Sequence, residues 1–189
     1  MAKQNRSKQG MRSRGNIQPE GSESQGGQTE LHELFLEELA DIYNAEQQLT
    51  KALPKFAKAA ESEELRQAFE THLEETEEQI SRLEEIAESL DESIKRKTCK
   101  GMQGLIEEGQ EMLKEQKDSA ALDAALIAAA QKVEHYEIAT YGTLAAWAEQ
   151  MGYAEVAELL GQTLQEEEIA DEKLTAIAES LANQRAQAE

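Results

Sequence analysis

Apolar residues recur at helical spacing over long stretches of this chain, and the first stretch carries a carboxylate on its apolar face. Side chains three or four positions apart share one side of a helix, so an apolar stripe is expected to pack against other helices. The stripe consists of Leu31, Phe35, Leu39, Ile42, Leu49 and Leu53, with Glu46 on its centre line. Because a buried carboxylate without a partner is costly, Glu46 predicts a proton or a positive charge beside it.

Two later segments repeat this combination of an apolar stripe and an inward carboxylate. Glu137 lies on a stripe that continues to Leu144, and Glu167 and Asp171 lie on one that continues to Leu174. Carboxylates that point inward from several helices of one bundle are typical of a metal site. The repetition therefore indicates one site shared between helices.

Periodicity and helix-breaking residues predict four long helices and one short helix. Their approximate ranges are 30–60, 62–90, 102–116, 118–151 and 154–181. Ser62 is predicted to cap the second helix, and Asp118 or Ser119 the third long one, because their side-chain oxygens accept bonds from free backbone N–H groups. Gly152 is predicted to end that third long helix, and Pro54 to kink or break the first.

The order of these helices predicts their arrangement. The connection between the second and third long helices is long and carries the short helix, so the chain forms an up-down pair, a crossover and a second pair. The sequence therefore predicts an all-α fold, a ferritin-like antiparallel four-helix bundle with an additional short crossover helix. The bundle domain covers residues 30–182, and residues 183–189 are predicted to fray.

The start of the chain differs in composition from the rest. Residues 1–29 are poor in apolar side chains, rich in Gly, Ser and Gln, and hold five basic against two acidic residues. Because such a segment cannot bury enough apolar surface to fold, it is predicted to be a disordered basic tail. It could contact nucleic acid or the acidic body, but a solubilising extension is the simpler interpretation.

Acidic residues dominate the charge of the chain. There are 39 acidic and 19 basic residues, which gives a formal net charge of −20. A polyanion of this kind is not expected to bind nucleic acid through its folded body, nor an anionic membrane surface. No apolar run approaches a membrane span and no signal peptide is visible. Since the single cysteine, Cys99, indicates a reducing compartment, we expect a cytoplasmic protein.

The inward polar residues fit one class of metal site. Carboxylate-bridged di-iron and di-manganese sites usually take one Glu from each of two helices and Glu-x-x-His from each of the other two. This chain departs from that arrangement, because its second helix has the order His72-x-x-Glu75 and its fourth long helix has no histidine. The candidate metal ligands are Glu46, His72, Glu75, Glu134, Glu137, Glu167 and Asp171. The predicted cofactor is a pair of iron ions, with manganese as the alternative.

Several of these residues also have a purely structural interpretation. Glu46 could hydrogen-bond Tyr43 or pair with a lysine of another helix, and His72 could be an ordinary interior histidine. Tyr141 is interpreted as core packing. Cys99 lies near two lysines that could lower the pKa of its thiol, but no catalytic base is nearby and a structural role is favoured.

Longer segments carry a family resemblance. They are LADIYNAEQQLTKALPK, HLEETEEQISRLEEI, CKGMQGLIEEG, ALIAAAQKVEHYEIATYGTLAAWAEQMGY and LLGQTLQEEEIADEKL. Over about residues 31–181 the chain closely resembles the YciF-like family of bacterial ferritin-like stress proteins. The resemblance implies a helical bundle paired into homodimers, a di-metal centre and a part in stress responses, and all the candidate ligands fall in the family's motifs.

Two functions from different classes follow. The first is a stress-associated di-iron protein that handles iron, oxygen or peroxide, with an oxidase or peroxidase-type activity. It would need an external electron donor, because the chain lacks the cysteine quartet of a rubredoxin-type centre. The alternative is a metal-free helical dimer that acts through protein contacts. The predicted dimer contact is an apolar strip formed by Met102, Leu105, Ile106 and Met112.

Overall fold

The computed structural model describes residues 29–188, and this part of the chain is almost entirely helical. Its elements are α1 Glu30–Ala59, α2 Glu63–Ser89, α3 Lys100–Glu115, α4 Leu122–Met151, α5 Ala154–Ile177, a π-helix Ala178–Ala182 and α6 Asn183–Ala188. Between residues 29 and 188 there is no strand, which confirms the predicted all-α class. The predicted disordered tail lies outside the described residues, except for Thr29. Residues 183–188, predicted to fray, form α6 with exposed side chains.

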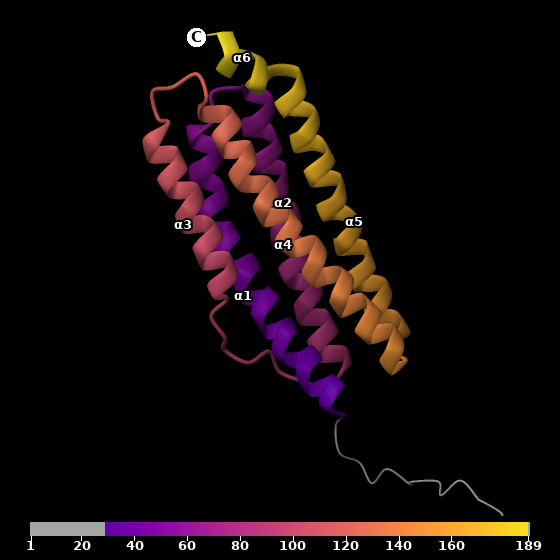
Figure 1. Cartoon of the computed structure of the whole chain (residues 1–189). Coiled ribbons are helices and arrows are strands. Elements are labelled where there is room, and N and C mark those ends of the chain that lie inside the picture. The colour runs from indigo at the N-terminus through magenta and orange to yellow at the C-terminus, as the bar shows by residue number, and fades with distance from the viewer. Residues whose placement is uncertain (1–28, 189) are drawn as a thin grey trace, which may run out of the picture.

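The helices form two hairpins that pack side by side. α1 packs along α2, α4 packs along α5, and the hairpins meet where α1 contacts α4 and α2 contacts α5. The crossover helix α3 lies outside this set of four, against α1 and α4 (Figure 1). This is the ferritin-like bundle with a crossover helix that the sequence predicted. Within residues 29–188 no helix has the length and apolar character that a membrane span needs.

The helix ends agree only partly with the predicted caps. The Ser62 side chain accepts a hydrogen bond from the Leu65 N–H, and Gly152 ends α4 in the left-handed region at φ 81°, as predicted. The predicted cap of α4 by Asp118 or Ser119 is wrong, because α4 begins at Leu122 and its N-terminus has no side-chain cap. The hydroxyl of Ser119 instead accepts a bond from the Ala121 N–H within the preceding turn.

Helix continuity also differs from the expectation. Of the kink or break predicted at Pro54, the break is absent, since α1 runs through it, with buried Leu53 and Phe56 on either side packed into the core. The irregular turn is instead the π-helix Ala178–Ala182, which contains neither glycine nor proline. Packing therefore decides the continuity of these helices more strongly than the local helix breakers do.

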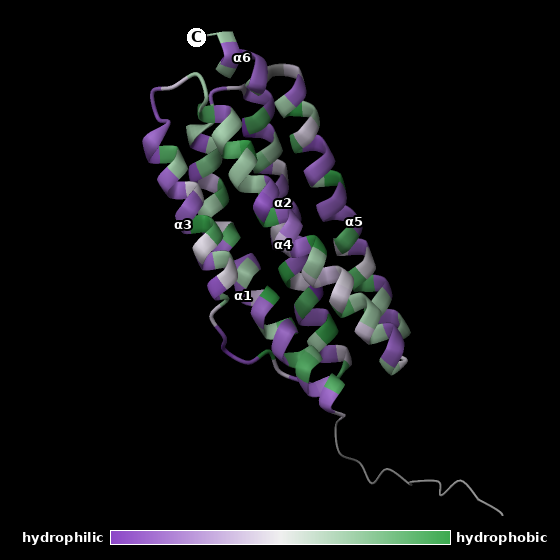
Figure 2. Cartoon of the chain, in the orientation of Figure 1, coloured by the Kyte–Doolittle hydropathy of each residue, from purple (hydrophilic) through white to green (hydrophobic). Residues whose placement is uncertain are grey.

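The apolar faces of the helices meet in one core, with hydrophilic residues on the opposite faces (Figure 2). The apolar strip of α3 belongs to this core. Met102 is fully buried, Ile106 is buried, and Leu105 and Met112 are half-buried. The strip proposed as a dimer contact is thus largely covered by α1 and α4, so it no longer supports a dimer through this face. Dimerisation itself stays a prediction.

Candidate metal centre

Four helices turn carboxylates or an imidazole toward the middle of the bundle. Glu46 comes from α1, His72 from α2, Glu134 and Glu137 from α4, and Glu167 from α5. All are buried, because each lies on the stripe that packs its helix against the others, and Glu46, Glu137 and Glu167 are 0% exposed. Charged side chains are almost never buried to this degree unless they are paired. We refer to these residues as the five donors.

The donors lie close enough to share a ligand. One potential ligand atom each from His72, Glu134, Glu137 and Glu167 lies within 4.8 Å of the others. The His72 Nε2 atom is 3.4 Å from Glu134 Oε2 and 3.9 Å from Glu167 Oε2. Glu46 borders the same group, since its pKa responds to the charges of Glu167 and His72. Side chains of α2, α4 and α5 therefore meet at one point, with Glu46 of α1 beside them.

Many polar atoms of this group have no hydrogen-bond partner in the described part of the chain. They are Glu46 Oε2, both ring nitrogens of His72, Glu134 Oε2, both carboxylate oxygens of Glu137 and Glu167 Oε2, and Gln79 Oε1 beside the group is a further one. Buried polar atoms without a partner are rare in folded proteins, and each one is costly. A cation bound among them would give these atoms a partner.

The pKa values of the donors in the metal-free group are raised. Burial, together with the charge of Glu167, raises the pKa of Glu46 to about 8. Burial and the neighbouring carboxylates raise the pKa of Glu137, and burial also raises the pKa of Glu134, although His72 opposes it. Burial alone would lower the pKa of His72, but the nearby carboxylates outweigh it and raise this pKa to about 10. Without a metal ion these donors therefore stay protonated to a higher pH than exposed groups of the same kind.

Tyr141 supports the first donor. Its hydroxyl donates a hydrogen bond to Glu46 Oε1, and the tyrosine is fully buried on α4. Tyr141 was interpreted as core packing, so this contact was missed, although it lies four residues after Glu137 and hence on the same face. The alternative partner Tyr43 donates instead to Glu84 Oε1, at 2.6 Å. Tyr141, and not Tyr43, therefore fixes the orientation of the Glu46 carboxylate.

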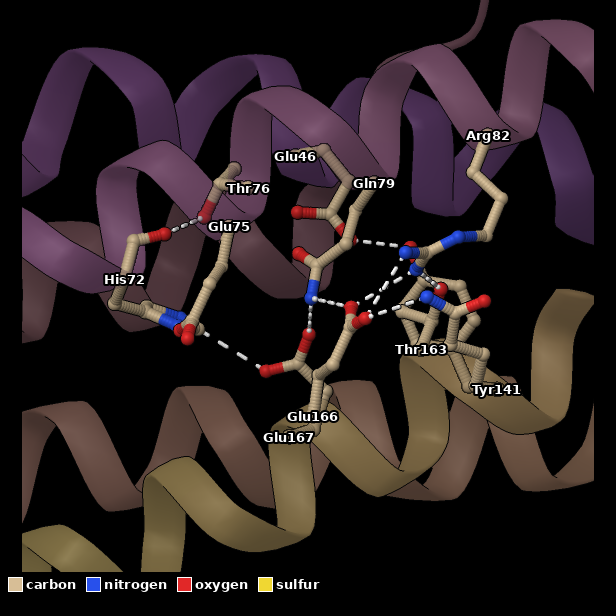
Figure 3. Close-up of polar contacts among 11 residues, drawn as sticks. Glu46, His72, Glu75, Thr76, Gln79, Arg82, Tyr141, Thr163, Glu166 and Glu167 are labelled. Carbon is tan, nitrogen blue, oxygen red and sulfur yellow. Dashed lines mark hydrogen bonds and ion pairs between the residues drawn. The ribbon is translucent and has the colours of Figure 1, made fainter.

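A polar network between α2 and α5 supports Glu167 (Figure 3). The Gln79 side-chain amide donates to Glu167 Oε1 and, at 3.3 Å, to Glu166 Oε2. The Arg82 guanidinium holds Glu166 with two bonds of 2.8 and 2.9 Å and also bonds the Thr163 hydroxyl. Burial alone would raise the pKa of Glu166, but Arg82 outweighs this effect and keeps that pKa below its usual value. Such partners fix the orientation of a metal ligand, and the sequence interpretation did not anticipate them.

The two remaining candidates differ from the five donors. Glu75 lies at the rim, with Oε2 3.5 Å from His72 Nδ1 and its side chain 41% exposed (Figure 3). Asp171 is turned toward α4, where Oδ1 accepts a bond of 3.1 Å from Gln131 and lies 3.5 Å from His135 Nε2. The structure thus places Glu75 within reach of the group and Asp171 in a different contact.

Cys99 is a structural residue. Its Sγ accepts a hydrogen bond from the Met102 N–H at the start of α3 and lies 3.0 Å from the Tyr136 hydroxyl, which donates to Asp41. Burial and the nearby Asp41 raise the pKa of the thiol. The suggestion that lysines lower this pKa is therefore wrong, and the favoured structural interpretation of Cys99 is supported by its role as the cap of α3.

Comparison with known proteins identifies the family. The domain of unknown function called DUF892 matches residues 30–187. The chain belongs to this family. Protein YciF of Escherichia coli strain K12 is 51% identical over 158 residues, which cover 83% of this chain and 95% of that protein. The predicted YciF-like membership is confirmed.

Solved structures of relatives share the fold. The crystal structure of the E. coli stress protein YciF has a TM-score of 0.78 and 48% identity, covering 86% of this chain and all of that one. The YcfI protein of Rhodopseudomonas palustris has a TM-score of 0.75 and 46% identity over 80% of this chain and 96% of its own. The helical bundle of this DUF892 member is thus the bundle of its relatives.

The donor types of this DUF892 chain suit some metals better than others. Four carboxylates and one imidazole are hard or borderline ligands, typical of iron and manganese sites in helical bundles. Softer metals that prefer thiolates find no sulfur here, since the chain's only cysteine lies at the start of α3. The residues therefore fit the predicted class of metal.

Proposed function

We propose that this protein holds a carboxylate-bridged di-metal centre, with two iron ions or alternatively manganese, and handles iron, oxygen or peroxide during stress. The observation that carries the proposal is the convergence of four buried donors beside buried Glu46, because all five have atoms without a hydrogen-bond partner in the described part of the chain. The stress association rests on the relative in E. coli, which is described as a stress protein. We place the protein in the cytoplasm as a homodimer, as its composition and family resemblance suggest.

The residues divide into ligands and supports. Glu46, His72, Glu134, Glu137 and Glu167 would hold the ions, and Glu75 is the rim carboxylate within reach. When bound, iron would supply one-electron redox chemistry toward oxygen or peroxide. Asp171 is left out of the ligand set, because its carboxylate is already bound by Gln131.

The supporting side chains act on protons and on orientation. His72 must release the proton that the apo-site favours, since imidazole binds a metal only in its neutral form. Tyr141 holds one oxygen of Glu46 and leaves the other free, and Gln79 does the same for Glu167. Each of these two carboxylates therefore has one oxygen held by a neighbour and one oxygen without a partner.

The electron donor would be another molecule. The only cysteine, Cys99, has a raised pKa and serves as the helix cap described above, so the chain offers no dithiol of its own. An oxidase or peroxidase-type cycle that returns iron to its ferrous state therefore needs an external reductant.

Metal content tests this proposal against its rival, the metal-free helical dimer. Protein purified without added metal is analysed for iron and manganese and is then titrated anaerobically with Fe²⁺. We expect two iron ions per chain, and faster consumption of hydrogen peroxide than by the same concentration of free Fe²⁺. A folded protein that binds neither metal would instead support the rival.

Two variants make the assay specific. Glu137→Ala removes a donor with both oxygens free and is expected to lose the rate advantage over free Fe²⁺ while keeping its helix content. Glu168→Ala removes an exposed carboxylate from α5 and is expected to match the wild type. Equal rates for wild type, Glu137→Ala and free iron would contradict a catalytic centre.

A further inference from the structure

A small pocket lined by α2, α5 and one residue of α4 borders two of the five donors. His72 and Glu134 line its inner end, and Ile169 and Lys173, both exposed, line its outer end. A pocket that borders buried donors and exposed side chains joins the centre to the solvent. Four larger pockets on the described surface contact none of the five donors.

The size of the pocket restricts what can pass. Its volume is about 80 Å³, and a water molecule in the liquid occupies about 30 Å³, so it has room for two or three waters. A metal ion that has shed most of its hydration shell, dioxygen or hydrogen peroxide fits this space.

Ile169 occupies an unusual position at the mouth of this pocket. It is 56% exposed, and only one other large apolar side chain in the described range, Leu34 at 43%, is strongly exposed. Neighbouring Glu168 and Glu172 on α5 are exposed and polar, as expected for the outer face of a helix. A bulky apolar group at the opening can cover the inner end without bonding to the ions or oxidants that pass.

The rim also offers a first contact for a cation. Glu75 lines the same pocket, is partly exposed, and approaches His72 Nδ1 to 3.5 Å. A carboxylate between water and an inner ligand can replace the waters that an entering ion loses. The pocket therefore has an outer end with exposed side chains, a carboxylate at its rim and an inner end lined by two of the donors.

We propose that this pocket is the entrance to the proposed metal centre and that Ile169 is its gate. The inference rests on the proposed function and adds the route of entry to it. A gate that lies outside the ligand set changes the rates of entry and exit together and leaves the equilibrium affinity unchanged.

The test uses the rates of Co²⁺ uptake by the chelator-treated full chain and of Co²⁺ release to excess chelator, both followed by absorbance. Ile169→Trp enlarges the gate and is expected to slow both rates by about tenfold or more, with the dissociation constant within about twofold of wild type. Ile169→Ala is expected to take up Co²⁺ at least as fast as the wild type. Leu34→Trp is the matched control on α1 and is expected to keep wild-type rates.

Each other outcome overturns a defined part of the argument. Wild-type rates in Ile169→Trp would overturn the entrance, while the metal centre itself would stand. A loss of affinity in Ile169→Trp as large as its loss of rate would show disturbed donors and would also overturn the gate. A wild-type chain that takes up no Co²⁺, Fe²⁺ or Mn²⁺ would overturn the proposed function and the entrance with it.

Discussion

Glu46→Gln is expected to change the stability of the metal-free protein and its metal affinity in opposite directions. The Glu46 carboxyl is 0% exposed and has a pKa of about 8, against an ordinary value of 4.5. Glutamine has nearly the same shape, and its amide oxygen can still accept the Tyr141 hydrogen bond. The substitution therefore removes a titrating group with little change in packing.

The size of the gain follows from the pKa. Because the folded state holds its proton more tightly than the unfolded state, the stability of the metal-free wild type falls as pH rises from about 4.5 to about 8. At pH 7 the gap to the unfolded value is about 2.5 pH units at about 1.4 kcal/mol each, so Glu46→Gln stabilises by up to about 3 kcal/mol. At pH 5 the gap is about 0.5 unit, and the gain is below about 1 kcal/mol.

Urea unfolding of chelator-treated protein at pH 5 and pH 7 measures both values. For a chain of this length the gain at pH 7 corresponds to a melting temperature roughly 6–12 °C higher. Glu168→Gln on the exposed face of α5 is the control and is expected to show no pH-dependent gain. With metal the order reverses, because Glu46→Gln is expected to bind at least about tenfold more weakly. A destabilised variant at pH 7, or an equal gain at both pH values, would refute the reasoning.

Two further predictions concern residues around the donors. Asp171→Ala is expected to keep the full metal stoichiometry, because its carboxylate is engaged with Gln131 and His135, and a loss of one ion per chain would restore it to the ligand set. Arg82→Met is expected to lower the free energy of unfolding, measured in urea, by about 1–3 kcal/mol. The substitution removes the buried guanidinium that donates two hydrogen bonds to Glu166 and one to Thr163. The exposed pair of Arg66 and Glu63 provides the control, since Arg66→Met is expected to cost less than about 1 kcal/mol.

Helical periodicity predicted which carboxylates are buried, because it determines on which side of a helix a residue lies. Glu46, Glu137 and Glu167 were expected on inward faces and are fully buried there. Periodicity does not determine the partner that an edge residue chooses. Asp171 lies four residues after Glu167, but the α4 side chains of Gln131 and His135 hold it at the edge of the stripe.

Contacts that are distant in sequence explain what was missed. Tyr141 binds Glu46 across 95 residues, and local sequence places Tyr141 on the face of Glu137 but does not identify its partner. The same limit applies to helix ends. Asp123 lies inside α4, yet its carboxylate accepts bonds of 2.8 Å from the backbone N–H groups of Glu61 and Ser62 at the start of α2. A local capping rule can assign Asp or Ser only to its own helix.

Charge balance bears on the number of ions that the proposed centre would hold. Glu46, Glu134, Glu137 and Glu167 carry four negative charges when ionised, and all are at most 2% exposed. One divalent ion would leave two of these charges uncompensated at a buried site, which is costly unless protons remain. Two divalent ions balance all four carboxylates if His72 is neutral, while Glu75 at the rim is screened by water.

Metal binding is therefore expected to release protons until two ions are bound. The protons come from His72, whose pKa in the metal-free protein is about 10, and from carboxyls such as Glu46, whose pKa is about 8. An anaerobic titration with Mn²⁺ in weak buffer at pH 7 measures this release against the ion added. We expect the release to end at two equivalents, and to be smaller in Glu46→Gln because that side chain has no proton to lose. An end point at one equivalent would contradict a di-metal centre, because a single ion would then suffice to displace every proton that the buried carboxylates hold.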